Sequence, residues 1–437
     1  MKGFKKAEHR TQNTEHRLKE NKRFAEKLRE LKKNSLVRKL TYIESSIGSR
    51  ITINGKRYIN FSSNDYLGLS KDHRIAEAAA KALGKYGFGS GASRFLSGSY
   101  IPHKKLEEKI ARFKGTEAAL VFNTGYSANT GIIPALVGDE DTIFSDELNH
   151  ASIIDGIKLS RAKVKIFRHR DMDHLEKLLK QTCHVEAQKT RKTIPPYPPL
   201  VKGGGGDCLA KSSAKKLIIT DTIFSMDGDI APLKNIVFLS KKYGAMLMID
   251  DAHGTGVLGR TGRGGLEHFD IKASASSAQG IIQMGTLSKA FGCFGGFAAG
   301  SKDLIDFLIN MARSFIYSTS LPPAIAEACI KAIDIVNSES DSLRKKLWAN
   351  RVKLYQGLKN LGYDTLNSET PIIPILAGDV KSALKMGNYL YKNKIFAPAI
   401  RPPTVPEEKC RIRFSVTAAH TDKDIGLVLE RLDKFKI

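Results

Sequence analysis

The sequence has few cysteines, and they follow no pattern that would bind zinc or build a disulfide framework. The five cysteines lie far apart, and none has a C-x-x-C partner: Cys183, Cys208, Cys293, Cys329 and Cys410. Disulfide frameworks belong to oxidising compartments and need paired cysteines. We therefore expect a protein of the reducing cytoplasm with no metal site.

Long hydrophobic runs are also missing. No stretch of about 18 apolar residues occurs, so no membrane span is expected. The basic residues 1–6 are not followed by the apolar run of a secretory signal. With 437 residues, 41% hydrophobic and 26% charged, the chain has an ordinary globular composition and the length of two or three domains.

Acidic residues are scarce relative to basic ones. The chain has 70 Lys and Arg against 45 Asp and Glu, a formal charge of +25, and residues 1–39 hold 14 Lys and Arg against 5 Glu. Such a charge favours polyanions, which include nucleic acid, an anionic membrane surface and an anionic substrate. No nucleic-acid reading module or cluster of base-stacking aromatics accompanies it, so we expect no nucleic-acid partner.

Hydrophobic spacing divides the chain into three regions. In residues 14–39, apolar side chains recur at helical spacing among charged ones, which predicts a surface helix; its thin apolar stripe makes a membrane-surface helix the weaker alternative. Residues 50–53 and 58–61, separated by Asn54-Gly55, predict a β-hairpin. From about residue 70 to 300, helical stretches alternate with apolar runs at 118–122, 217–220, 245–249 and 280–284.

Continuous apolar runs that alternate with helices are typical of a parallel sheet buried on both faces. A long helix is expected at 324–360, followed by strands at 372–376 and 410–416. The predicted organisation is α/β: a basic helix and hairpin (1–60), a large, mostly parallel-sheet domain (61–310) and a smaller C-terminal α+β domain (311–437).

One stretch interrupts this pattern. Residues 183–214 contain two Pro-Pro pairs and a run of four glycines, which do not form a packed element. We expect a mobile surface insertion between a helix at 173–181 and the strand at 217. A proline-rich docking site is the alternative.

Reactive side chains follow two of the apolar runs. The run 245–249 leads into Asp250, Asp251 and His253, and the run 280–284 is followed by Lys289. Ligands of open α/β sheets bind at the carboxyl ends of the strands. A carboxylate, an imidazole and a lysine are therefore expected at one sheet edge.

These residue types suit pyridoxal 5′-phosphate (PLP). A desolvated lysine forms a Schiff base with a carbonyl. The pyridine nitrogen of PLP needs an acid, here Asp250, and its phenolic oxygen needs a donor, here His253. The segment 123–129 opens a helix after an apolar run, and helix N-termini bind phosphate. Thr286 and Ser288 add hydroxyl groups.

Several longer blocks resemble the α-oxoamine synthases, which are fold-type-I PLP-dependent transferases with the aspartate-aminotransferase-like fold. The matching blocks span residues 35–435 outside 183–214 and include NDYLGLS (64–70), GSGASRFLSG (89–98), NTGYSAN (123–129), DELNHASIIDG (146–156), FSMDGDIAPL (224–233), DDAHGTGVLG (250–259), GTLSKAFG (285–292), YSTSLPP (317–323) and RPPTVP (401–406).

The resemblance implies a role for each matching position. Lys289 resembles the Schiff-base lysine, Asp250 the partner of the pyridine nitrogen and His253 the donor to the phenolic oxygen. His150 resembles the histidine stacked on the cofactor ring. Further cofactor-binding positions are matched by Gly125, Tyr126, Ser225 and Thr286. The positions that bind the amino-acid carboxylate are matched by Asn64 and Arg413. The positions on the acyl-CoA side are matched by Arg38 and Thr404.

The resemblance also implies an activity, a decarboxylative condensation of an amino acid with an acyl thioester, in a homodimer. The blocks AIRPPTVP and RIRFSVTAAHT most resemble the members that join L-alanine to a pimeloyl thioester of CoA or a carrier protein in biotin biosynthesis. The alternatives are glycine C-acetyltransferase, 5-aminolevulinate or sphingoid-base synthesis, another fold-type-I enzyme such as an aminotransferase, and a basic anionic-surface binder.

Overall fold

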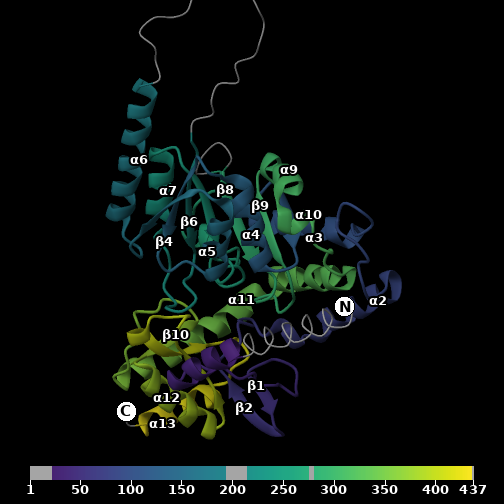
Figure 1. Cartoon of the computed structure of the whole chain (residues 1–437). Helices are drawn as coiled ribbons and strands as arrows, with labels where there is room; N and C mark the ends of the chain where they lie inside the picture. The colour runs from purple at the N-terminus through teal and green to yellow at the C-terminus, as the bar shows by residue number, and fades with distance from the viewer. Residues whose placement is uncertain (1–21, 193–213, 275–279, 436–437) are drawn as a thin grey trace, which may run out of the picture.

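The computed structural model describes residues 22–192, 214–274 and 280–435, which form an upper and a lower body in the view of Figure 1. The upper body contains a seven-stranded sheet in the order β3-β9-β8-β7-β6-β4-β5. Strands β9 and β3 are antiparallel to their neighbours, and all other neighbours are parallel. The strands are β3 (Ala118–Phe122), β4 (Thr142–Asp146), β5 (Lys163–Phe167), β6 (Lys216–Asp221), β7 (Met246–Asp250), β8 (Ile281–Thr286) and β9 (Gly296–Gly300).

The four apolar runs became β3, β6, β7 and β8 because their side chains are buried on both faces of this sheet. In β6, Leu217 and Ile219 pack in one core cluster, whereas Ile218, between them, packs in another. One face is covered by α4 (Gly125–Leu136), α5 (Ala151–Ser160), α9 (Lys302–Met311) and α10 (Arg313–Ile316). The other carries α3 (Ile101–Lys114), α6 (Met172–Lys192), α7 (Leu233–Lys242) and the short α8 (Gly265–His268). The predicted α/β architecture is confirmed.

The lower body combines the N-terminal hairpin with the C-terminal region. Strands β1 (Arg50–Ile53) and β2 (Lys56–Asn60) form the predicted hairpin, whose turn has positive φ at Asn54 and Gly55. Strand β2 pairs in parallel with β11 (Ile395–Phe396), which ties this segment to the chain beyond 311. The second small sheet contains β10 (Ile372–Gly378), β13 (Cys410–Ser415) and β12 (Ala399–Ile400), beside α12 (Val380–Lys392) and α13 (Asp422–Asp433).

A long helix connects the two bodies. Helix α11 (Pro323–Asn360) packs against α3 and α2 (His73–Tyr86) above and reaches α13 below (Figure 1). Short 3₁₀ turns occur at Leu69–Lys71 and Glu407–Lys409. The helix expected at 324–360 is confirmed.

Two predicted segments differ from the structure in extent. Helix α6 does not end near residue 181 but continues to Lys192. The physical reason is that residues 183–192 contain neither proline nor glycine and are mostly good helix formers. The rest of the expected insertion, 193–213, lies outside the described residues. The N-terminal helix covers residues 22–33, and 14–21 are not described.

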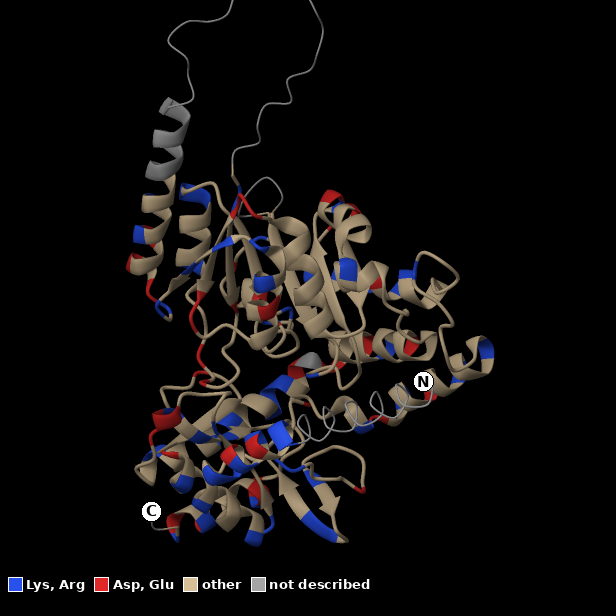
Figure 2. Cartoon of the chain, in the orientation of Figure 1, with Lys and Arg blue, Asp and Glu red and all other residues tan. Residues whose placement is uncertain are grey.

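Basic residues are spread over the molecule. Figure 2 shows Lys and Arg on helices and strands of both bodies, with many of them in the lower one. On the N-terminal helix, Phe24 and Leu28 remain 68% and 58% exposed. Within the described ranges, no helix is both long enough and apolar enough to cross a membrane.

Candidate active site

The carboxyl ends of three neighbouring strands build the candidate site. Asp221 is the last residue of β6, Asp250 is the last residue of β7, and Lys289 lies three residues beyond the end of β8. Because these strands are parallel neighbours, their ends share one edge of the sheet. This edge faces the lower body, which contributes Arg413 from β13 and Asn64 from the segment after β2.

Asp250 is buried and held in one orientation. One carboxylate oxygen accepts a hydrogen bond from Asn129 Nδ2 at 2.7 Å, and the other accepts one from the Ala252 amide at 3.0 Å. Asn129 lies on α4 and also donates to the Ser152 hydroxyl at 2.8 Å. The carboxylate is therefore fixed before any ligand arrives, which is a requirement for efficient electrostatic catalysis.

The adjacent Asp251 points into the interior instead. Its carboxylate forms a fully buried ion pair with Lys114 at 2.7 Å and accepts hydrogen bonds from the Thr255 hydroxyl and the Gly265 amide. Because all its partners belong to the protein core, Asp251 stabilises the loop after β7 and is not available to a ligand.

Lys289 is half-buried, and its amine is less basic than that of a solvated lysine. Burial lowers the pKa of Lys289 to about 8, although the negative charges of Asp250 and Asp221 oppose this shift. Gly292 and Gly296 allow the backbone around it to pack closely. A side chain at Gly292 would meet the backbone of residues 69–70, and one at Gly296 would meet that of Thr124.

His253 lies deep in the site beside a tyrosine. Its Nδ1 atom is 2.7 Å from the hydroxyl of Tyr66. Burial, together with the positive charges of Lys289 and Arg413, lowers the pKa of His253 well below its usual value. Burial also raises the pKa of Tyr66 to about 12. A neutral imidazole and a protonated phenol thus share one hydrogen bond.

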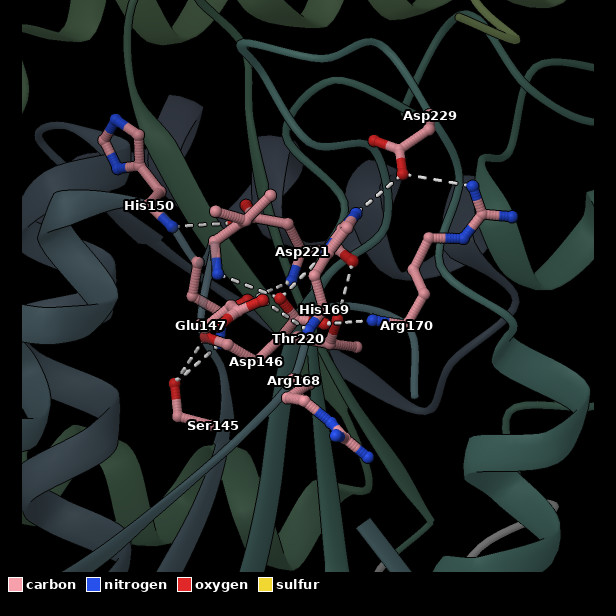
Figure 3. Close-up of polar contacts among 12 residues, drawn as sticks. Ser145, Asp146, Glu147, His150, Arg168, His169, Arg170, Thr220, Asp221 and Asp229 are labelled. Atoms are coloured by element: carbon pink, nitrogen blue, oxygen red, sulfur yellow. Dashed lines mark hydrogen bonds and ion pairs between the residues drawn. The ribbon is translucent and has the colours of Figure 1, made fainter. Parts of the chain in front are cut away.

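His150 is the N-cap residue of α5, and the charges of Asp250 and Lys289 act on its imidazole. The ring is exposed, and its Nδ1 atom contacts the Ser152 hydroxyl at 2.8 Å. The His150 amide donates to Asp221 at 2.7 Å, which joins the start of α5 to the end of β6 (Figure 3). Burial and repulsion from Asp250 raise the pKa of Asp221 well above its usual range.

The N-terminus of α4 lies next to Thr286. Thr124 caps this helix through a hydrogen bond from the Ser127 amide at 3.0 Å. A Cβ atom on Gly125 would be 3.7 Å from Thr286 Cβ, and the hydroxyls of Thr286 and Ser288 are 2.7 Å apart. The helix N-terminus and two hydroxyls therefore lie together, an arrangement that suits an anion.

Tyr126 is half exposed at this helix start. Its hydroxyl donates to the Asp155 carboxylate on α5, and this bond raises the pKa of Tyr126. The aromatic ring is consequently held across the gap between α4 and α5.

The predicted carboxylate-binding pair is brought together. Arg413 NH2 donates to the Asn64 side chain at 3.1 Å, and its Nε donates to the Ser225 carbonyl at 2.5 Å. A third bond, to the Ser415 hydroxyl at 2.7 Å, fixes the guanidinium. Arg413 also contributes to the lowered pKa values of Lys289 and His253, so its charge reaches the same site.

The predicted acyl-side pair also meets, at the molecular surface. Arg38 donates to the carbonyl of Pro402 at 2.9 Å and approaches the Thr404 hydroxyl at 3.5 Å. The guanidinium of Arg401 donates a hydrogen bond to the Val37 carbonyl at 2.8 Å. The segment after the N-terminal helix is thereby attached to the loop before β13.

Three residues of the site were missed as participants: Asp221, Asn129 and Tyr66. Asp221 ends an apolar run in the same way as Asp250, so the strand-end rule alone could have found it. Asn129 lies one helical turn after Gly125, a spacing that places it on the same face. No local signal marks Tyr66, because its partner His253 is 187 positions away.

The donor set suits an aromatic aldehyde that carries a phosphate. A lysine with a lowered pKa, a buried carboxylate for a ring nitrogen and a helix N-terminus with hydroxyls are all present. Among the described residues, no group of three or more His, Cys, Asp or Glu is arranged to hold a metal ion. Fold and site together define a PLP-dependent transferase of fold type I.

Comparison with known proteins agrees with this class. The model of the family described as aminotransferase class I and II matches residues 56–432, and the chain belongs to this family. The chain is 48% identical to a putative 8-amino-7-oxononanoate synthase of Thermodesulfovibrio yellowstonii, with 92% of this chain and 94% of the relative covered. It is 46% identical to the 8-amino-7-oxononanoate synthase of Thermoanaerobacter pseudethanolicus, covering 94% and 95%.

Solved structures show the same fold. Serine palmitoyltransferase of Sphingomonas wittichii is 31% identical, with a TM-score of 0.79 over 94% of this chain and 95% of that chain. An 8-amino-7-oxononanoate synthase of Francisella tularensis is 28% identical, with a TM-score of 0.69 over 86% and 97%. A serine palmitoyltransferase of S. paucimobilis, 29% identical with a TM-score of 0.79 over 90% and 92%, has bound PLP. The predicted family, fold class and cofactor are confirmed.

Proposed function

We propose that this chain condenses L-alanine with a pimeloyl thioester to give 8-amino-7-oxononanoate, the thiol and carbon dioxide, in biotin biosynthesis. One observation carries the proposal: Arg413, which is held by Asn64, and Asp250 are both close enough to Lys289 for their charges to act on its amine. A guanidinium that could bind a carboxylate thus lies near a lysine of lowered pKa. The names of the curated relatives support the choice of product.

Residues of the upper body would hold PLP. Asp250 would pair with the ring nitrogen, and His253 would donate toward the phenolic oxygen. The amides that start α4 at Gly125 and Tyr126, with the hydroxyl of Thr286, would hold the phosphate, and the exposed ring of His150 would cover the cofactor face. Ser225 lies nearby through its bond to Arg413. When bound, PLP supplies an electron-accepting ring that stabilises negative charge at the amino-acid Cα.

The protein's own groups then position the substrates and move the proton. Arg413 and Asn64 hold the carboxylate of alanine, for which a guanidinium offers two parallel hydrogen bonds. Lys289 Nζ takes the Cα proton as general base, because its lowered pKa leaves part of the amine neutral near neutral pH. A bond forms between Cα and the thioester carbonyl carbon while the carbon–sulfur bond breaks. The former carboxylate of alanine leaves as carbon dioxide, and Cα, which keeps the bonding electrons, takes a proton back from Lys289.

The acyl donor would enter near Arg38 and Thr404, which are exposed and already in contact.

We further propose a cytoplasmic homodimer. Large apolar side chains at the surface support an association: Phe88 is 83% exposed, Leu96 79% and Tyr317 71%. Light scattering of the purified protein would report the mass of one or two chains.

A substrate comparison tests the function. The protein reconstituted with PLP is assayed for thiol release with pimeloyl-CoA or acetyl-CoA, each with alanine or glycine. We expect the pair of alanine and pimeloyl-CoA to react fastest, and Lys289→Ala to abolish turnover. Preference for glycine with acetyl-CoA would instead indicate glycine C-acetyltransferase. Amino-group exchange without thiol release would indicate an aminotransferase.

A further inference from the structure

A second cluster of charged side chains lies behind the site, around His169. This residue follows β5, and both nitrogens of its ring contact carboxylates: Nδ1 is 2.9 Å from Asp146, and Nε2 is 2.7 Å from Asp229. Both carboxylates are buried. Figure 3 shows these residues as a connected network with His150 at its margin.

The contacts require His169 to be a cation. An ionised carboxylate only accepts hydrogen bonds, so a ring with one carboxylate at each nitrogen donates from both nitrogens. The hydrogen bonds and charges of Asp146 and Asp229 outweigh burial and raise the pKa of His169 to about 9. The other charged groups around it are Arg170, which donates to Asp229 at 3.1 Å, Glu147, which accepts from the His169 amide, and Glu369, which is bound to Arg170.

One arm of the cluster holds the turn that carries His150. Asp146 accepts hydrogen bonds from His169 and from the amides of Leu148 and Arg170, at 2.9 to 3.0 Å. The turn is completed by Asn149, which bonds Ser145 and the backbone of β6. The His150 ring points away from this network (Figure 3), and the charges of Asp250 and Lys289 act on it.

The other arm holds the loop that carries Ser225. The backbone carbonyl of Asp229 accepts a hydrogen bond from the Phe224 amide at 3.1 Å, and this bond joins the two ends of the loop. The ring of His169 meets the ring of Phe224 edge-on, with centroids 4.3 Å apart. Ser225 follows Phe224 in the chain, and its carbonyl accepts a hydrogen bond from Arg413.

We propose that His169 is a positioning residue, which as a cation clamps the turn 146–150 to the loop 223–229 and so sets the relative places of His150 and Arg413. The inference rests on the proposed function, because it assumes that His150 covers PLP and that Arg413 binds the amino acid. His169 itself touches neither candidate ligand position.

Substitution of His169 tests the clamp. His169→Gln keeps a polar side chain of similar length but cannot carry the charge, and His268→Gln is the matched control at an exposed histidine of α8. Holoenzymes are compared in the visible circular dichroism of bound PLP, in kcat, in the KM for alanine and in melting temperature.

For His169→Gln we expect a kcat about tenfold or more below wild type, because small displacements of reacting groups are costly. We also expect a weakened visible dichroism and a raised KM for alanine, with His268→Gln like wild type. Unchanged dichroism and kcat, or a lower melting temperature alone, would overturn the proposal.

A second variant keeps the test valid if His169→Gln does not fold. Asp229→Asn removes one of the two charges that raise the pKa of His169, so the imidazolium loses its proton at a lower pH than in wild type. The visible dichroism of this variant should therefore be normal near pH 6. As the pH is raised, it should decline earlier than the dichroism of wild type. An unchanged pH profile would contradict the clamp. Failure of wild type to condense alanine would contradict the proposed function only, since the dichroism still reports on His169.

Discussion

The two aspartates at the end of β7 have opposite surroundings although they are neighbours in the sequence. Asp250 faces the site and bonds Asn129, whereas Asp251 is paired with Lys114 in the core. Side chains of adjacent residues at a strand end point to different sides. The same chemical change should therefore affect catalysis at one position and folding at the other.

Replacement of each aspartate by asparagine separates these roles. Asp250→Asn should lower kcat about 100-fold or more, because the fixed charge that we propose for the ring nitrogen of PLP is lost, while stability changes little. Asp251→Asn should lower the free energy of unfolding by about 3–5 kcal/mol, because Lys114 is left as an unpaired buried charge. Urea unfolding measures the free energy of unfolding of each variant, and steady-state kinetics measures its kcat. Equal destabilisation by the two variants would contradict the assignment.

The lowered pKa of Lys289 predicts how the protein without cofactor responds to pH. Only the neutral amine attacks an aldehyde, and burial shifts the pKa from 10.5 to about 8. The rate at which Lys289 captures PLP should rise with pH and reach half its maximum near pH 8. Stopped-flow visible absorbance measures it, with Lys289→Ala as the blank. A midpoint near 10.5 would show a solvated lysine.

Single residues were predictable where chemistry follows a strand. Asp250 ends an apolar run, and His253 and Lys289 each lie three residues beyond the end of a strand, so the strand-end rule places them together. Tyr66 and the His169 clamp could not be found in this way. Their partners lie on distant segments, and only the packing of the loops after β4, β5 and β6 brings His169 to Asp146 and Asp229.

At the scale of elements, the strands and the hairpin were predicted because their patterns are local. Asn54-Gly55 fits a turn with two positive φ values, and the four apolar runs match buried strands. The sequence does not predict the pairing of β2 with β11, since a two-residue strand whose partners lie 336 positions away leaves no pattern. The predicted end of α6 is too early, because the prolines and glycines of this stretch begin only at Pro195, beyond the helix.

The direction of α6 predicts that the insertion is dispensable for catalysis. The helix packs on α7 and β5, and its carboxyl end points away from the lower body and from the site (Figure 1). Replacement of residues 185–213 by a short linker should leave kcat and KM within about twofold of wild type, because loops at the far edge of a sheet tolerate change. Loss of activity in a folded variant would contradict this.

At the scale of the whole molecule, the charge of +25 is not confined to one element. This charge predicts an attraction for anions, but the sequence does not show where the attraction acts, because the field depends on how distant segments pack. Arg38 and Arg401 come from opposite ends of the chain and meet at the proposed acyl entrance. The field should therefore assist the arrival of a polyanionic donor more than the chemical step.

Ionic strength separates arrival from chemistry. Between about 0.05 and 0.5 M salt the Debye length falls from roughly 14 to 4 Å, so steering by distant charges is lost. We expect kcat/KM for pimeloyl-CoA to drop several-fold while kcat stays constant. Pimeloyl-N-acetylcysteamine is the matched control, because it has the same acyl group and thioester without the nucleotide phosphates. An equal loss for both donors would place the salt effect at the site itself, and constancy for both would mean that the surplus charge does not guide the substrate.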